Sequence, residues 1–202
     1  MVMEDFLDRL SSADPVPGGG GVAALCGALS ASLASMVANL TTGKKKYAEY
    51  QQDIERIIED SAAIRDELYS FIAKDAEAFE PLSKAYGIPK DEPGRDERLE
   101  EALMVAARTP LELVICLEKL VGILLELSTK GSRLAVSDVG VAATLLEAGA
   151  KSAVLNVYIN TKLMKNEDVA KSFNMKAERL VSSISDSCSN IYANVESELK
   201  KF

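Results

Sequence analysis

The chain has 202 residues, of which 48% are hydrophobic and 27% are charged, and its formal net charge is −8. These values predict one folded domain over residues 1–202 that buries a core of its own. The acidic balance argues against a general nucleic-acid binder, which needs a basic surface. The chain contains no histidine, which excludes Ser-His-Asp catalysis, Cys-His catalysis and imidazole-ligated metals. Proton transfer must therefore use groups such as Asp, Glu, Lys, Tyr or Cys.

The three cysteines, Cys26, Cys116 and Cys188, lie far apart in helical patterns and form no CxxC pair. We expect them to be reduced, buried thiols in a cytoplasmic protein, and we expect no metal site. The first ten residues lack the basic segment and long apolar core of a signal peptide. The uncharged stretch 15–43 is long enough to span a membrane, but its Ala, Ser and Gly content favours a buried helix and no membrane.

Apolar residues recur at helical spacing almost throughout, and no segment shows the alternation of a strand. A short helix is predicted over residues 3–11, a second over about 21–41 that ends near Gly43, and a long third over about 45–85. Within the second helix the small residues recur every four positions, which lets another helix approach closely; they are Ala23, Gly27, Ala31 and Ser35.

Residues 87–97 form a polar loop rich in helix breakers, and another helical stretch begins near 96. Thr109 and Pro110 resemble a capping box with proline at the first helical position, so a new helix or a kink is expected there, continuing to about 128. Ser137 or Asp138 is expected to cap a largely buried helix that reaches about 164, and Asn166 begins the last helix. The predicted fold is an all-α bundle of about six or seven helices, several of them long.

The glycines Gly18, Gly19 and Gly20 stand just before the second helix in the stretch PVPGGGGVAA. Their spacing partly matches a dinucleotide-binding fingerprint, but that motif follows a strand and none is predicted here. Two interpretations are left open. The free backbone N–H groups of the helix N-terminus face an anion or a carbonyl oxygen, or the glycines only let the chain turn sharply between packed helices.

Asp75 occupies a core-facing position of the third helix, within the apolar stripe Ile64, Leu68, Ile72, Phe79 and Leu82. A carboxylate on such a face is costly unless it is paired or hydrated. Asp75 therefore either bonds to a neighbouring helix, or lies in a cleft as a carboxyl with a raised pKa that moves protons.

Three lysines, Lys44, Lys45 and Lys46, follow the end of the second helix in an otherwise acidic protein. They form either a solvated patch at a helix C-terminus or a landing site for a polyanionic substrate, to which Lys130 and Arg133 would add.

Polar residues also interrupt the most apolar of the predicted helices, at Asp138, Asn156 and Asn160. Side-chain amides in such positions satisfy internal hydrogen bonds, or bind a heterocycle that carries donor and acceptor edges.

Four blocks together carry a family resemblance: PVPGGGGVAALCGALSASLASMVANLTTGKKKY, KDAEAF from Lys74, SDVGVAA from Ser137 and NVYIN from Asn156. In this order they resemble the cyclodeaminase domain of the formiminotransferase-cyclodeaminase family over nearly the whole chain. One departure is visible, because many members have serine where this chain has Gly21.

The resemblance implies an all-α homodimer of one-carbon metabolism and histidine catabolism that acts on a folate, with or without a polyglutamate tail, and needs no other cofactor. The implied reaction is a lyase step, in which 5-formiminotetrahydrofolate gives 5,10-methenyltetrahydrofolate and ammonia. Asp75 takes the place of the family's catalytic aspartate. As a hypothesis, the lysines 44–46 hold the glutamate tail and the glycine amides orient the substrate.

Two other functions stay open at this point. One is a methenyltetrahydrofolate cyclohydrolase, which gives 10-formyltetrahydrofolate on the same scaffold and places a similar demand on the acid/base group. The other is a helical dimer without catalysis. The sequence does not separate the two enzymes, and the charge on the apolar stripe speaks against the third possibility.

Overall fold

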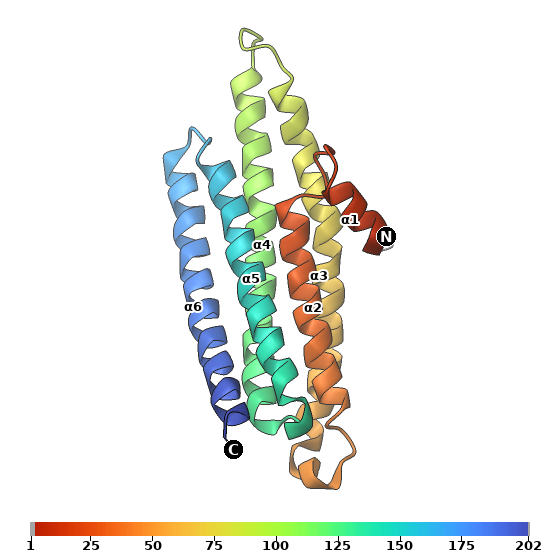
Figure 1. Ribbon diagram of the computed structural model, residues 1–202. Helices are drawn as coiled ribbons and strands as arrows, with labels where there is room; N and C mark the ends of the chain where they lie inside the picture. Colours follow the sequence, from red (N-terminus) through yellow and green to blue (C-terminus); the bar gives the residue numbers. More distant parts are fainter. Residues whose placement is uncertain (1–2, 202) are drawn as a thin grey trace.

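The computed structural model describes residues 3–201, and these are built from helices without a strand, as predicted (Figure 1). Six α-helices and two short 3₁₀ helices follow one another along the chain: α1 (Met3–Leu10), α2 (Gly19–Asn39), η1 (Lys45–Tyr50), α3 (Gln51–Tyr86), α4 (Arg95–Lys130), η2 (Arg133–Ala135), α5 (Val136–Thr161) and α6 (Glu167–Leu199).

The long helices run roughly parallel or antiparallel to one another (Figure 1). Helices α6, α5, α2 and α3 contact each other in that order, and α4 contacts all four. Apolar side chains from these five helices form the main core. The α3–α4 hairpin extends beyond the N-terminal end of α2, where a second apolar cluster joins it to the region around Met164 and Ala170. The space at this end of the bundle is where the candidate site lies.

Helices α2 and α5 approach closely because small residues face each other. A Cβ atom placed on Gly149 of α5 would lie 3.1 Å from the carbonyl oxygen of Ala23, and Ser30 Oγ donates a hydrogen bond to the carbonyl of Ala142 at 2.8 Å. The predicted role of the small-residue ridge is confirmed at this contact. Helix α2 has the length and mean hydropathy (1.8) of a membrane span, but 56% of that segment is buried within the bundle, as in a core helix.

Of the new helix or the kink expected at Thr109, the new helix is wrong, because α4 continues unbroken from Arg95 to Lys130. The hydroxyl of Thr109 donates back to the carbonyl of Val105 instead of capping a helix start. Packing on both sides of Pro110, which is buried, outweighs the missing N–H of the proline.

The predicted cap at Ser137 or Asp138 is also wrong. Helix α5 begins at Val136, directly after η2, and has no side-chain cap, so both residues lie inside its first turn. The start predicted at Asn166 is confirmed, because its Oδ1 accepts a hydrogen bond from the N–H of Val169. The long third helix begins with the 3₁₀ segment η1 and becomes α-helical only from Gln51.

Candidate active site

A cavity of about 280 Å³ lies at the N-terminal end of α2, between that helix, the last third of α3, the first third of α4 and the end of α5. It brings together six of the residues singled out in the sequence: Gly18, Gly19, Gly20, Asp75, Asn156 and Asn160. The remaining lining residues have apolar or aromatic side chains, and the first two of them belong to the α1–α2 connection. They are Pro15, Val16, Ala78, Phe79, Leu82, Tyr86, Ala106, Ile159 and Leu163.

Asp75 projects from α3 into this cavity and is half-buried. Burial raises the pKa of its carboxyl, and a hydrogen bond from the backbone N–H of Gly21 acts in the opposite direction. No charged group of the described chain contributes to this shift, and the ammonium of the neighbouring Lys74 lies over the ring of Phe71 instead. The carboxyl is therefore unpaired, which favours its protonated form and suits it to accept and donate a proton.

The position of Asp75 explains why the chain needs glycine at residue 20. A Cβ atom on Gly20 would collide with the carboxyl group of Asp75. At Gly21 a Cβ atom would find ordinary contacts, 3.5 Å from Pro17 Cβ and 3.8 Å from Phe6 Cε2. Gly20 thus allows the N-terminus of α2 to approach the carboxyl group of Asp75. At residue 21, in contrast, there is room for a side chain such as the serine that the family resemblance suggests.

One wall of the cavity is a single stripe of α3. Asp75, Phe79, Leu82 and Tyr86 are spaced by four, three and four residues and all line the cavity. Between Asp75 and Tyr86 the helix rises by about 16 Å. Tyr86 stands at the outer end and is 48% exposed. The sequence pattern predicted Phe79 and Leu82 as core residues and did not single out Tyr86. The same helical spacing nevertheless places Tyr86 on their face of the helix.

The opposite wall comes from the last turns of α5. The side-chain nitrogen of Asn156 donates to the carbonyl of Ser152 at 2.9 Å, and a Cβ atom on Gly19 would lie 3.4 Å from it. The side-chain nitrogen of Asn160 donates to two backbone carbonyls, those of Ala106 at 3.0 Å and Asn156 at 2.8 Å. Both side chains are half-buried and keep hydrogen-bonding capacity toward the cavity.

The structure does not bring the lysines to this cavity. Lys44, Lys45 and Lys46 follow the C-terminal end of α2, whereas the cavity lies at its N-terminal end. A helix of 21 residues is about 30 Å long. Within one chain, the lysines and the cavity therefore cannot bind the same small chemical group. Lys44 Nζ lies 3.4 Å from Ser132 Oγ. Their role as a landing site for a polyanion stays a prediction.

Asp138 is separated from the cavity for the same reason. It lies in the first turn of α5, and Asn156 and Asn160 lie near the other end of that helix. The eighteen residues between Asp138 and Asn156 correspond to about 27 Å. Within a single chain the structure therefore does not bring Asp138 together with Asn156 and Asn160. Across the described residues, no three Cys, Asp or Glu side chains gather in a metal-binding arrangement.

With this geometry in place, comparison with known proteins identifies the family. The sequence profile described as formiminotransferase-cyclodeaminase matches residues 2–179. The chain belongs to this family. It is 38% identical to a methenyltetrahydrofolate cyclohydrolase of Methylorubrum extorquens over 201 residues, which cover 98% of this chain and 97% of that protein.

Other members of the family show similar agreement. The chain is 37% identical to the formimidoyltransferase-cyclodeaminase of Mus musculus over 173 residues, which are 84% of this chain but 32% of the mouse protein. The crystal structure of a formiminotetrahydrofolate cyclodeaminase from Thermotoga maritima superposes with a TM-score of 0.90 at 32% identity and covers 98% of both chains. The names of these family members refer to cyclodeaminases and cyclohydrolases that act on folates.

Proposed function

We propose that this protein is a formiminotetrahydrofolate cyclodeaminase, which converts 5-formiminotetrahydrofolate to 5,10-methenyltetrahydrofolate and ammonia. The observation that carries the proposal is Asp75, an unpaired carboxyl with a raised pKa at the side of a cavity. Membership of the family supports the substrate class, and the likeness to the Thermotoga maritima protein along both chains supports the reaction.

The reaction asks for one group that both takes and returns a proton. N10 of the folate attacks the formimino carbon, and the resulting tetrahedral centre carries two ring nitrogens and one amino group. N10 loses a proton as this bond forms, and the amino nitrogen must gain one before it leaves as ammonia. Asp75, as a carboxylate, takes the proton from N10 and, as a carboxylic acid, delivers it to the leaving nitrogen.

The environment of the carboxyl supports this double role. A carboxyl at its usual pKa is a weak acid catalyst near neutral pH, because almost none of it is protonated. Burial raises the pKa of Asp75 toward neutrality. The backbone N–H of Gly21 acts on the carboxyl in the opposite direction and partly offsets this rise.

A second candidate is a methenyltetrahydrofolate cyclohydrolase, favoured by the likeness to the Methylorubrum extorquens protein along its whole length. Here water attacks the methenyl carbon and the bond from that carbon to N5 breaks. Of the two protons that the water loses, one ends on N5 and the other goes to solvent. Asp75 would take the first proton from water, so the same cavity serves either chemistry.

The two reactions are separated by the chromophore of methenyltetrahydrofolate. The purified protein is mixed in one cuvette with 5-formiminotetrahydrofolate and in another with 5,10-methenyltetrahydrofolate, and the absorbance is followed. A cyclodeaminase makes the chromophore appear in the first cuvette, and a cyclohydrolase makes it disappear in the second. A protein that does neither, and that binds no tetrahydrofolate at millimolar concentration, contradicts the proposal and supports a non-catalytic helical protein.

We also propose that the protein is a homodimer. The outward faces of α2 and α5 carry apolar side chains that are between 39% and 67% exposed: Leu29, Met36, Val141, Leu155 and Ile159. Helix α2 contains no charged residue over its whole length. Burying the uncharged outward face of α2 against a second copy removes apolar surface from water. Light scattering at micromolar concentration tests this proposal, and a mass of 21.7 kDa would contradict it.

A further inference from the structure

Pro110 leaves one backbone carbonyl of α4 without its helical partner. In an α-helix each N–H donates to the carbonyl four residues earlier. Proline has no N–H, so the carbonyl of Ala106 receives no hydrogen bond from position 110. Ala106 lines the cavity and is 8% exposed. A buried carbonyl without a donor is costly, so a donor from another element is expected there.

That donor is Asn160 of α5. Its Nδ2 donates to the carbonyl of Ala106 at 3.0 Å and to the carbonyl of Asn156 at 2.8 Å. Both partners are backbone carbonyls, which only accept, so the nitrogen end of the amide must face them. This chemistry fixes the orientation of the side chain. The opposite end, Oδ1, therefore presents an acceptor that cannot exchange places with the nitrogen without breaking two hydrogen bonds.

The same side chain faces the cavity, and no donor within residues 3–201 reaches its Oδ1. Across the cavity, the N–H groups of Gly19 and Gly20 belong to the first turn of α2, where the first bond of the helix ladder is that of Val22 to Gly18. These amides therefore have no acceptor within the helix. The cavity thus offers backbone donors on one wall and a fixed oxygen acceptor on the other.

We propose that Asn160, positioned by the Ala106 carbonyl that Pro110 leaves free, recognises the amino edge of the pterin ring of the substrate. This inference rests on the proposed folate-dependent function and deepens it. A pterin carries N–H donors, including the 2-amino group, on its pyrimidine edge. Asn160 Oδ1 accepts a hydrogen bond from the 2-amino group, and Pro110 is the positioning residue that leaves the Ala106 carbonyl free to orient Asn160.

A rigid acceptor discriminates against a ligand that lacks the matching donor, because the oxygen then loses its solvation without gaining a partner. The test uses tetrahydrofolate and its 2-desamino-2-methyl analogue, titrated calorimetrically into the wild-type protein and the variants Asn160→Ala and Pro110→Ala. Asn190→Ala, an exposed asparagine of α6 outside the cavity, is the matched control. Circular dichroism verifies that each variant is folded.

We expect the wild-type protein and the control to prefer tetrahydrofolate by about tenfold, the size of one such hydrogen bond. Asn160→Ala abolishes this preference. Pro110→Ala reduces it, because the new N–H competes with Asn160 for the Ala106 carbonyl. Binding is read without turnover, so the result does not depend on which reaction the protein catalyses.

Equal affinity of the wild-type protein for the two ligands overturns the proposal, even if the variants do not fold. An Asn160→Ala protein that keeps the full preference overturns the role of Asn160, and a Pro110→Ala protein that keeps it overturns the role of the proline. In these cases tetrahydrofolate still binds and the proposed function stands. Absence of any binding of tetrahydrofolate to the wild-type protein overturns the proposed function together with the inference.

Discussion

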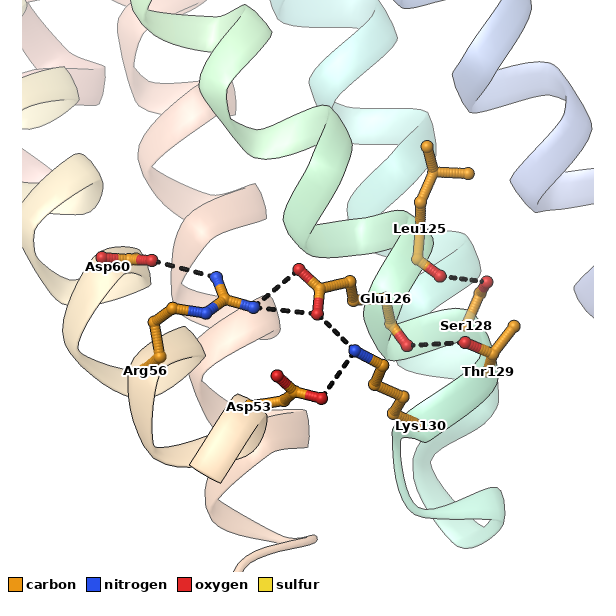
Figure 2. A network of polar contacts seen from close by, with 8 residues as sticks. All are labelled: Asp53, Arg56, Asp60, Leu125, Glu126, Ser128, Thr129 and Lys130. Carbon is orange, nitrogen blue, oxygen red and sulfur yellow. Dashed lines mark hydrogen bonds and ion pairs between the residues drawn. The ribbon is translucent and has the colours of Figure 1, made fainter. Parts of the chain in front are cut away.

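Two of the aspartates of helix α3, Asp53 and Asp75, lie in opposite electrostatic settings. Asp53, near the start of the helix, forms an ion pair with Lys130 at 2.7 Å. Lys130 also forms an ion pair with Glu126 at 2.7 Å. Figure 2 shows how Arg56 extends this network from α3 to α4. Asp75, about 33 Å further along the helix, lies in the cavity without a charged partner.

The two settings move the pKa in opposite directions. The hydrogen bond from Lys130 lowers the pKa of Asp53, whereas burial raises the pKa of Asp75. A paired carboxylate holds its charge over the physiological range and is unsuited to exchange protons, so the network at Asp53 serves to link α3 to α4. An unpaired carboxyl in a cavity costs stability, and this cost is typical of a catalytic group.

The largest expected effect is the loss of turnover in Asp75→Asn. The amide keeps the size of the side chain and an acceptor for the N–H of Gly21, but it cannot carry the proton. We expect kcat to fall by about 10²–10⁴-fold. Glu77→Gln, two residues along the same helix and exposed, is the control and keeps its turnover. Steady-state kinetics on the active substrate measure both, and an active Asp75→Asn enzyme would remove Asp75 from the mechanism.

A smaller but clear effect is expected when a methyl group is added at the α2 N-terminus. In Gly20→Ala the new Cβ collides with the carboxyl of Asp75 and displaces it, so we expect kcat/KM to fall by about 10²-fold, in line with a misplaced catalytic group. Gly21→Ala meets only ordinary contacts and should stay within about threefold of the wild-type protein. Comparable activity of the two variants would contradict the proposed need for glycine at residue 20 beside the Asp75 carboxyl.

The raised pKa of Asp75 predicts that this residue lowers the stability of the protein as the pH rises. Below the unfolded pKa of about 3.9, Asp75 is protonated in both states and has no effect. As the pH rises from there through the folded pKa, the unfolded state gains by ionising first, so the wild-type protein loses stability relative to Asp75→Asn. We expect the variant to melt at a higher temperature than the wild-type protein at pH 7 and to lose this advantage toward pH 4. Calorimetry at pH 4 and 7 tests this, and an advantage that shrinks as the pH rises would contradict it.

The smallest effect is expected in the paired network. Glu126→Gln removes the ion pairs to Arg56 and Lys130, which are partly exposed, so we expect a loss of at most about 1 kcal/mol that high salt reduces. The pKa of Glu126 is lowered by Lys130 and Arg56, so this contribution is present above pH 4.3 or so and disappears on acidification. Glu118→Gln, exposed on the same helix, is the control, and catalysis should be unchanged in both variants.

Local patterns predicted most of the helices and one decisive residue. The spacing of Ile64, Leu68 and Ile72 placed Asp75 on the apolar face of its helix, and the structure places it there, half-buried at a cavity. The errors lie where local signals compete with packing. Thr109 and Pro110 resemble a helix start, but α4 passes through them because its flanking residues are buried on both sides.

The sequence by itself determined the helical class of the chain, the apolar faces of its helices and the position of an ionisable residue, Asp75, on one of those faces. All three follow from a period of 3.6 residues. Which helix ends meet was decided only by the tertiary structure. It set Gly20 against Asp75, joined Asn160 to the carbonyl that Pro110 leaves free, and separated both from Lys44 and Asp138. These contacts join residues far apart in the chain, and they depend on how whole helices pack, which no local spacing records.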